Sequence, residues 1–134
     1  LNHLETLISL LPADMQKDAV MISGKMTTKK GKAEREQALE DMRSGKKKYL
    51  FATYSLCKEG LDIPRLERLY MASPVKDYTV VVQSIGRIAR TFEGKAKPIC
   101  YDFVDDIAYL VKSYKKRWSH YKKVGCYLCQ NHTE

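Results

Sequence analysis

The chain lacks the features that mark membrane, secreted and disulfide-stabilised proteins. It has no apolar run near the roughly 18 residues that a membrane helix needs. Its N-terminus lacks a basic region followed by a long apolar one, so it does not resemble a secretory signal. The four cysteines do not form a disulfide framework, and Cys57 and Cys100 fall in segments that we expect to be packed. These absences predict a cytoplasmic protein with no membrane partner.

A phosphate-binding loop of the Walker A type is also absent. Such a loop ends in Gly-Lys-Ser/Thr, which places backbone N–H groups, a lysine and a hydroxyl around phosphates and Mg²⁺. The Gly-Lys pairs of this chain are followed instead by Met26, Ala33, Lys47 and Ala96. No Asp-Glu-Ala-Asp or Asp-Glu-x-His run occurs either. By itself, the chain is not expected to hydrolyse a nucleoside triphosphate.

Positive charge is in excess. The 24 basic and 16 acidic residues give a formal net charge of +8 and a pI near 9.3. Such an excess favours a polyanionic partner, for which nucleic acid is the obvious candidate. The charge gathers in four clusters: Lys29-Lys30-x-Lys32, Lys46-Lys47-Lys48, Lys115-Lys116-Arg117 and Lys122-Lys123. Each cluster could equally be a solvated surface.

Hydrophobic periodicity predicts one domain of alternating helices and strands. Helices are expected over residues 4–11 and 33–43 and from about residue 106, with Gly45 as a C-terminal cap. Strands are expected over residues 19–23, 49–53, 69–72 and 98–104, and a basic loop over residues 25–32. Six residues share one face of the last helix, which favours core packing over base stacking for its aromatic members: Ile107, Leu110, Val111, Tyr114, Trp118 and Tyr121. Strands separated by helices indicate a parallel α/β sheet.

The segment 83–90 carries the most informative chemistry. Arg87 and Arg90 lie three positions apart, so on a helix they would share a face. A guanidinium offers a planar fork of donors and never loses its charge, which suits phosphate binding. Gly86 removes a side chain where a ligand or another backbone could come close. The alternative is an ordinary amphipathic basic helix.

Three patterns occur in a fixed order: Thr53, then Gly60-Leu61-Asp62-Ile63-Pro64, then Gln83-x-x-Gly86-Arg87-x-x-Arg90. Their order and spacing resemble motifs V and VI of the second helicase superfamily. The resemblance is closest to DEAD/DEAH-type helicases of the restriction-system and phage kinds. It implies the second RecA-like domain of such a motor over residues 1–125, a three-layer α/β fold with a mainly parallel central sheet flanked by helices. Residues 126–134 would be a tail that continues into an absent segment.

The resemblance decides whether residues 78–82 are predicted to form a strand or a helix. The β-branched segment 78–82 favours a strand by local propensity. In the helicase pattern this segment begins the helix that carries Gln83 to Arg90. We expect the helix, with Asp77 as its N-cap, because tertiary packing often overrides propensity.

By resemblance, the nucleotide-facing residues are Gln83, Gly86, Arg87, Arg90, Gly60 and Asp62. Arg90 would be the arginine finger and Arg87 its partner at the phosphates, because a positioned guanidinium stabilises charge during phosphoryl transfer. Gln83 would help to organise the nucleotide and water. Asp62, placed by the turn at Gly60, would link the nucleotide site to the domain. The alternative for Asp62 is a turn residue before proline.

The resemblance also implies contacts with a nucleic-acid backbone. Thr53, at the end of a predicted strand, and the loop at Ser23 and Gly24 match the positions that make them. A strand-end hydroxyl is the alternative for Thr53. ATP and Mg²⁺ would be bound mainly by an absent N-terminal RecA-like domain of the same protein. DNA is favoured over RNA, although the motifs leave that choice open. A nucleic-acid-binding module without ATP turnover is the alternative function.

The C-terminal pattern Cys126-x-x-Cys129-x-x-His132 offers three zinc ligands at short spacing. A structural zinc site usually needs four ligands, and no fourth cysteine or aspartate is near. We therefore expect no metal site in this chain.

Overall fold

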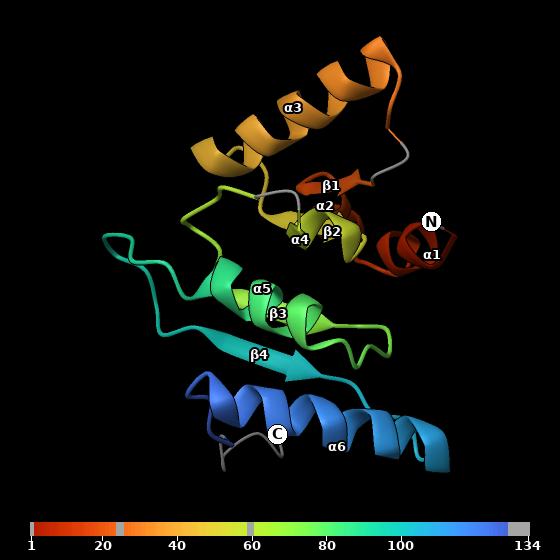
Figure 1. Cartoon of the computed structure of the whole chain (residues 1–134). Coiled ribbons are helices and arrows are strands. Elements are labelled where there is room, and N and C mark those ends of the chain that lie inside the picture. Colours follow the sequence, from red (N-terminus) through yellow and green to blue (C-terminus); the bar gives the residue numbers. More distant parts are fainter. Residues whose placement is uncertain (1, 24–25, 59–60, 129–134) are drawn as a thin grey trace. The chain divides into compact units, whose positions relative to one another are not determined.

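The computed structural model describes residues 2–23, 26–58 and 61–128 (Figure 1). The chain divides into two compact units, Leu1–Arg65 and Leu66–Glu134. In both units the strands pair in parallel and are joined through helices. The predicted α/β fold is thereby confirmed.

Within its described residues, the first unit contains one pair of strands and four helices. In chain order these are α1 (Asn2–Ser9), α2 (Ala13–Gln16), β1 (Ala19–Ile22), α3 (Lys29–Ser44), β2 (Tyr49–Ala52) and α4 (Ser55–Lys58). Strands β1 and β2 pair with Ala19 opposite Tyr49 and Ile22 opposite Ala52. The short helices α2 and α4 were not predicted, because four residues are too few to show a helical period.

Helix α3 begins earlier than the sequence pattern predicts. It begins at Lys29 because Thr28 caps it: the Thr28 Oγ1 accepts a hydrogen bond from the Gly31 N–H at 3.0 Å. The prediction of a loop over residues 25–32 is therefore wrong from Lys29 onward, where the chain is helical. The predicted C-terminal cap is confirmed, since Gly45 has φ 82°, in the left-handed region that favours glycine.

The second unit contains β3 (Arg68–Met71), α5 (Tyr78–Ile88), β4 (Ile99–Asp102) and α6 (Ala108–Lys123). Strands β3 and β4 pair with Arg68 opposite Ile99 and Met71 opposite Asp102. The core of this unit joins α5 to α6 through Val81, Ile85 and Tyr121. Partly buried apolar side chains from β3, β4, α6 and the neighbouring loops pack against it: Leu69, Val75, Cys100, Trp118 and Cys126.

The conflict over segment 78–82 is decided in favour of the helix. The Asp77 carboxylate caps α5 by accepting a hydrogen bond from the Val80 N–H at 3.0 Å, as predicted. Val80 and Val81 are buried, so tertiary packing outweighs their strand propensity. The helix ends at Ile88, however, so Arg90 lies beyond it and not on the shared helical face that was expected.

Helix α6 matches most of its predicted apolar face. Tyr121 is buried and Trp118 packs against the core, which confirms packing roles for these two aromatic residues. Ile107 is an exception, because it is the N-cap residue and is about half exposed. No helix in the described parts of the chain is both long and apolar enough to cross a membrane.

Candidate functional site

Ser23 and Thr53 lie together at the carboxyl edge of the first sheet. They directly follow Ile22 and Ala52, which are opposite each other in the parallel register. Ser23 is buried and Thr53 is half-buried. The Thr53 Oγ1 lies 2.9 Å from the Ser55 Oγ. Carboxyl edges of parallel strands are where such sheets bind ligands. Gly24, the third predicted backbone-contacting residue, lies outside the described residues.

Asp62 presents its side chain to the surface of the first unit. Leu61 and Ile63 on either side are buried, whereas Asp62 is exposed. The Asp62 carbonyl accepts a hydrogen bond from the Arg43 Nε at 2.9 Å. Arg43 lies on α3, so this bond anchors the backbone of the loop to that helix. Gly60, which was predicted to shape this turn, falls outside the described part of the chain.

Arg43 itself is held by two carboxylates on its own helix. Its Nη1 lies 3.1 Å from Glu36 and 3.4 Å from Glu40. The hydrogen bond to Glu36 is the main cause that raises the pKa of Arg43. This small network orients the guanidinium that holds the Asp62 backbone.

Gln83 and Arg87 lie four positions apart on α5, so their side chains share one side of the helix. Both are half-buried beside the buried stripe of that helix. The Gln83 Oε1 is buried and accepts no hydrogen bond within the described residues. Leaving a buried acceptor unsatisfied costs free energy, so such an atom at a candidate site suits a donor from a ligand or water.

Gly86 leaves open space on the exposed side of α5. Apart from the adjoining residues and the nearby backbone of its own helix, a Cβ placed at this position would meet no described atom within 4 Å. Packing within the chain therefore does not explain the glycine, although a glycine inside a helix is less stable than an alanine. The open space is compatible with the predicted approach of a ligand or another backbone.

The loop after α5 holds the backbone of Arg90. The Lys95 Nζ donates a hydrogen bond to the Arg90 carbonyl at 2.5 Å. The Ala96 N–H in turn donates to Glu67 at 2.9 Å, which ties the loop to the residue before β3. Burial is the main cause that lowers the pKa of Lys95. Arg90 itself is exposed. Sequence reasoning missed Lys95, since nothing in the motif pattern marks it.

Arg117 corrects one of the predicted basic surface clusters. Its side chain is only 2% exposed and forms a paired hydrogen bond with Asp102, Nε to Oδ2 at 2.8 Å and Nη2 to Oδ1 at 2.7 Å. The hydrogen bond to Asp102 is the main cause that raises the pKa of Arg117. Only Lys115 and Lys116 of that cluster are exposed. The helical spacing from Leu110 through Tyr114 to Arg117 and Tyr121 is the signal that could have placed Arg117 on the inner face.

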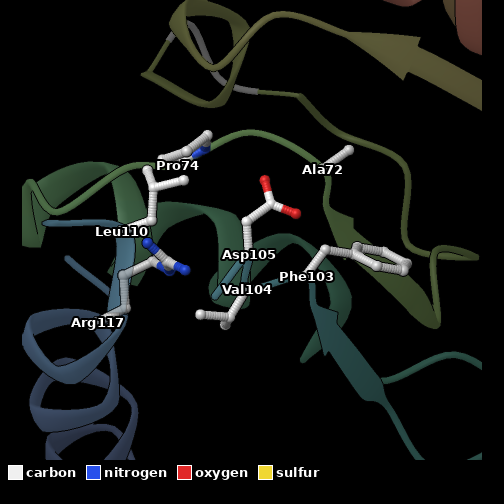
Figure 2. Close-up of a pocket in the computed structure, with 7 residues that line it drawn as sticks. All are labelled: Ala72, Pro74, Phe103, Val104, Asp105, Leu110 and Arg117. Carbon is white, nitrogen blue, oxygen red and sulfur yellow. The ribbon is translucent and has the colours of Figure 1, made fainter. Parts of the chain in front are cut away.

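A small pocket lies where β3 and β4 end (Figure 2). Its volume is about 110 Å³, too small for a nucleotide, since ligand sites of that size class run to several hundred Å³. Its lining consists of Ala72, Pro74, Phe103, Val104, Asp105, Leu110 and Arg117. None of the predicted site residues that the structure describes lines it, so the pocket does not coincide with the predicted nucleotide site.

Of the three residues in the zinc-like pattern, the structure describes only Cys126. Cys126 is half-buried, and burial raises the pKa of its thiol. Cys129 and His132 lie outside the described residues. Among residues 2–23, 26–58 and 61–128, no group of three or more histidine, cysteine, aspartate or glutamate side chains could hold a metal ion.

Comparisons with known proteins give a consistent result. Residues 2–92 match the family described as "Helicase conserved C-terminal domain". A protein of Invertebrate iridescent virus 6, named "Putative helicase 161L", is 37% identical over 78 residues, which cover 58% of this chain and 17% of the relative. "Putative helicase 22" of Sulfolobus islandicus filamentous virus (isolate Iceland/Hveragerdi) is 28% identical over 105 residues, 78% of this chain and 19% of the relative. The chain thus spans less than a fifth of the length of either relative.

Proposed function

Because the chain belongs to the helicase C-terminal domain family, we propose that it is the second RecA-like motor domain of an ATP-dependent nucleic-acid helicase or translocase. The observation that carries this proposal is the arrangement on α5. Gln83 and Arg87 share one side of the helix, Gly86 leaves open space, and Arg90 follows in an anchored loop. A binding module without ATP turnover would have no use for this set.

In this proposal the two arginines act on the phosphates of ATP. Arg90 is the arginine finger: its exposed guanidinium neutralises charge that shifts among the phosphate oxygens during transfer. Arg87 supports it at the phosphates, and Gln83 orients the nucleotide or the attacking water through its buried amide. Asp62 belongs to the proposed set by its position in the motif pattern, and Arg43 anchors the backbone of its loop.

The proposal includes two partners, a second motor domain and nucleic acid. An N-terminal RecA-like domain would bind most of the ATP and Mg²⁺, since this chain has no Gly-Lys-Ser/Thr loop. Nucleic acid would contact Ser23, Gly24 and Thr53 at the carboxyl edge of the first sheet, with DNA favoured over RNA. Cyclic closure and opening of the two motor domains would then move the strand.

The experiment that tests the proposal measures nucleic-acid-stimulated ATP hydrolysis by the full-length protein and its Arg90→Ala variant. A finger acts most strongly when charge develops in the transition state, so kcat should fall by on the order of 10³-fold while ATP binding changes little. Lysine at position 90 should restore little, because it lacks the planar fork of donors.

Lys116→Ala is the matched control, because Lys116 is exposed on α6 and its loss removes one positive charge. A kcat for Arg90→Ala within about tenfold of wild type would refute the finger role. Absence of ATP turnover in the intact wild-type protein, with nucleic-acid binding retained, would favour the binding module instead.

A further inference from the structure

The guanidinium of Arg117 joins α6 to the segment that leads into α5. Beyond its pair with Asp102, the Arg117 Nη1 donates to the Val75 carbonyl at 3.0 Å and to the Ser113 Oγ at 3.1 Å. Figure 2 shows Arg117 reaching from α6 toward the part of this segment that contains Pro74. The Tyr121 hydroxyl also donates to Asp102, at 2.5 Å. The carboxylate is therefore held from two turns of the same helix.

Helix α6 also holds the carbonyl of the next residue, Lys76. The His120 Nε2 donates to the Lys76 carbonyl at 3.0 Å, and its ring packs edge-on against Tyr78 with centroids 4.9 Å apart. His120 is buried. The two carbonyls just before the N-cap Asp77 are thus both fixed by α6, which lies beyond the segment that matches the helicase family.

We propose that Arg117, with His120 beside it, is a positioning residue for Arg87 on α5 and for Arg90 just after that helix. The inference rests on the proposed function of Arg87 and Arg90. Arg87 lies ten residues beyond Asp77, which is about 15 Å along a helix. A tilt of a few degrees at the start of α5 would therefore displace Arg87 by about 1 Å, and a displacement of that size can cost on the order of 10²-fold in rate.

The conservative variant Arg117→Lys separates positioning from simple loss of charge. A lysine ammonium can still pair with Asp102, but it cannot also reach the Val75 carbonyl with the fork geometry of arginine. In the full-length protein we expect kcat for nucleic-acid-stimulated ATP hydrolysis to fall roughly 10²-fold, with KM for ATP changed less than about threefold. Lys116→Ala should leave both unchanged.

A variant cycle tests whether Arg117 acts through the two arginines. If it does, adding Arg117→Lys to a variant that already lacks both of them, Arg87→Ala with Arg90→Ala, should slow the enzyme by less than about threefold more, because the interactions it positions are already gone. If kcat instead fell by roughly a further 10²-fold, Arg117→Lys would cause a general defect in the enzyme, and the proposal would be overturned. Wild-type rates for Arg117→Lys, beside a slow Arg90→Ala, would also overturn it and leave the finger role standing.

Amide hydrogen exchange supplies a test that needs no enzymatic activity. Arg117→Lys should accelerate exchange at the start of α5, at Val80 and Val81, by roughly tenfold or more, while β4 amides keep their wild-type rates. Exchange in α5 equal to that of Lys116→Ala would overturn the proposal even if the wild-type protein hydrolysed no ATP. An absence of ATP hydrolysis in the wild-type protein would refute the proposed function, independently of the exchange result.

Should Arg117→Lys not fold, His120 tests the same anchor at the neighbouring carbonyl. Leucine at position 120 removes the donor to Lys76, whereas glutamine retains one. His120→Leu should accelerate exchange at the start of α5 by about tenfold, and His120→Gln should stay within about threefold of wild type. Equal exchange in the two variants would contradict the proposed anchor.

Discussion

At the scale of single residues, α5 contains two features that its own stability does not explain. Gly86 lies inside the helix with open space beside it, and the buried Gln83 Oε1 accepts no hydrogen bond from the described residues. Each feature costs free energy in the isolated fold. Proteins tolerate such costs mainly at functional sites, which agrees with the proposed role of this helix at a nucleotide.

Replacing Gly86 by alanine should make the fold more stable and the motor slower. Alanine is the better helix former by about 0.5–1 kcal/mol, and no described atom blocks the new methyl group. Urea unfolding of residues 1–134 should show this gain in the free energy of unfolding. In the full-length protein, kcat for ATP hydrolysis should fall at least about tenfold if a ligand or backbone approaches this position.

Gly31→Ala is the contrasting control in α3, because a Cβ there would lie 3.0 Å from the Thr28 Oγ1. It should give no comparable gain in stability. A Gly86→Ala protein that is both more stable and fully active would show that nothing approaches Gly86 during the cycle.

Cys100 should be an unreactive thiol in the folded domain. Burial, followed by the nearby Asp102 carboxylate, raises its pKa to about 12. Iodoacetamide at about pH 8.5 should therefore alkylate Cys100 at least about tenfold more slowly in the folded chain than in urea, because the thiolate is the reactive form. Peptide mapping by mass spectrometry measures both rates, and equal rates would contradict the partly buried placement of Cys100.

The same pKa shift has a consequence for stability. Since the folded pKa lies above the ordinary thiol value near 8.5, folding favours the protonated thiol. This contribution is complete below about pH 8.5 and is lost as the pH rises toward 12. The loss of stability above pH 9 should therefore be smaller in Cys100→Ala than in wild type, as followed by thermal unfolding.

At the scale of elements, side-chain caps decide where two helices begin. Thr28 starts α3 and Asp77 starts α5, each through a hydrogen bond of 3.0 Å to a backbone N–H in the first turn. The cap of α3 matters more than usual, because Lys29, Lys30 and Lys32 place positive charge at the positive end of the helix dipole. Positive charge at this end opposes helix formation, and the Thr28 cap offsets part of that cost.

Removal of this cap should destabilise the first unit. Thr28→Ala should lower the free energy of unfolding by about 1 kcal/mol, the usual effect of losing a threonine cap. Urea unfolding of residues 1–134 measures it. Thr27→Ala, at the exposed neighbouring position, should change stability by less than about 0.5 kcal/mol. If the two variants behave alike, Thr28 does not set the start of α3.

At the scale of the whole molecule, the excess of eight positive charges should dominate binding to nucleic acid. Phosphate attraction works through release of counterions, so it depends strongly on salt and little on base sequence. Fluorescence anisotropy with labelled single strands should show affinity of residues 1–134 falling roughly tenfold or more between about 50 and 200 mM salt. Tight binding that ignores salt would instead indicate base stacking or base readout.

Paired lysine variants can locate the contacts. Lys29→Gln with Lys30→Gln removes exposed charge from the first turn of α3, and Lys122→Gln with Lys123→Gln removes the same amount from the last turn of α6. The pair that reduces the salt slope marks the surface on which phosphates bind. If both double variants show the same dependence of affinity on salt, the attraction to nucleic acid is diffuse and not confined to one surface.

Much of the secondary structure could be predicted from local patterns. The strands and the cap at Gly45 lie where short-range signals place them, because each depends on neighbouring residues. The cap at Asp77 was expected from the helicase pattern, since local propensity favours a strand there. The start of α3 was missed because a cap at Thr28 outweighs a basic, glycine-containing first turn. The end of α5 at Ile88 was also missed, since no glycine or proline there marks it.

The amino-acid sequence by itself determined the α/β class, the family and the identity of the candidate site residues. These follow from periodicity and from short motifs, in which residue type and spacing carry the chemistry. Only the tertiary structure decided that Arg117 is buried against Asp102 and holds the Val75 carbonyl. The reason is physical: helical spacing can place Arg117 on the inner face of its helix, but only the fold brings Asp102, fifteen residues earlier on β4, and the Val75 carbonyl within hydrogen-bonding distance of its guanidinium.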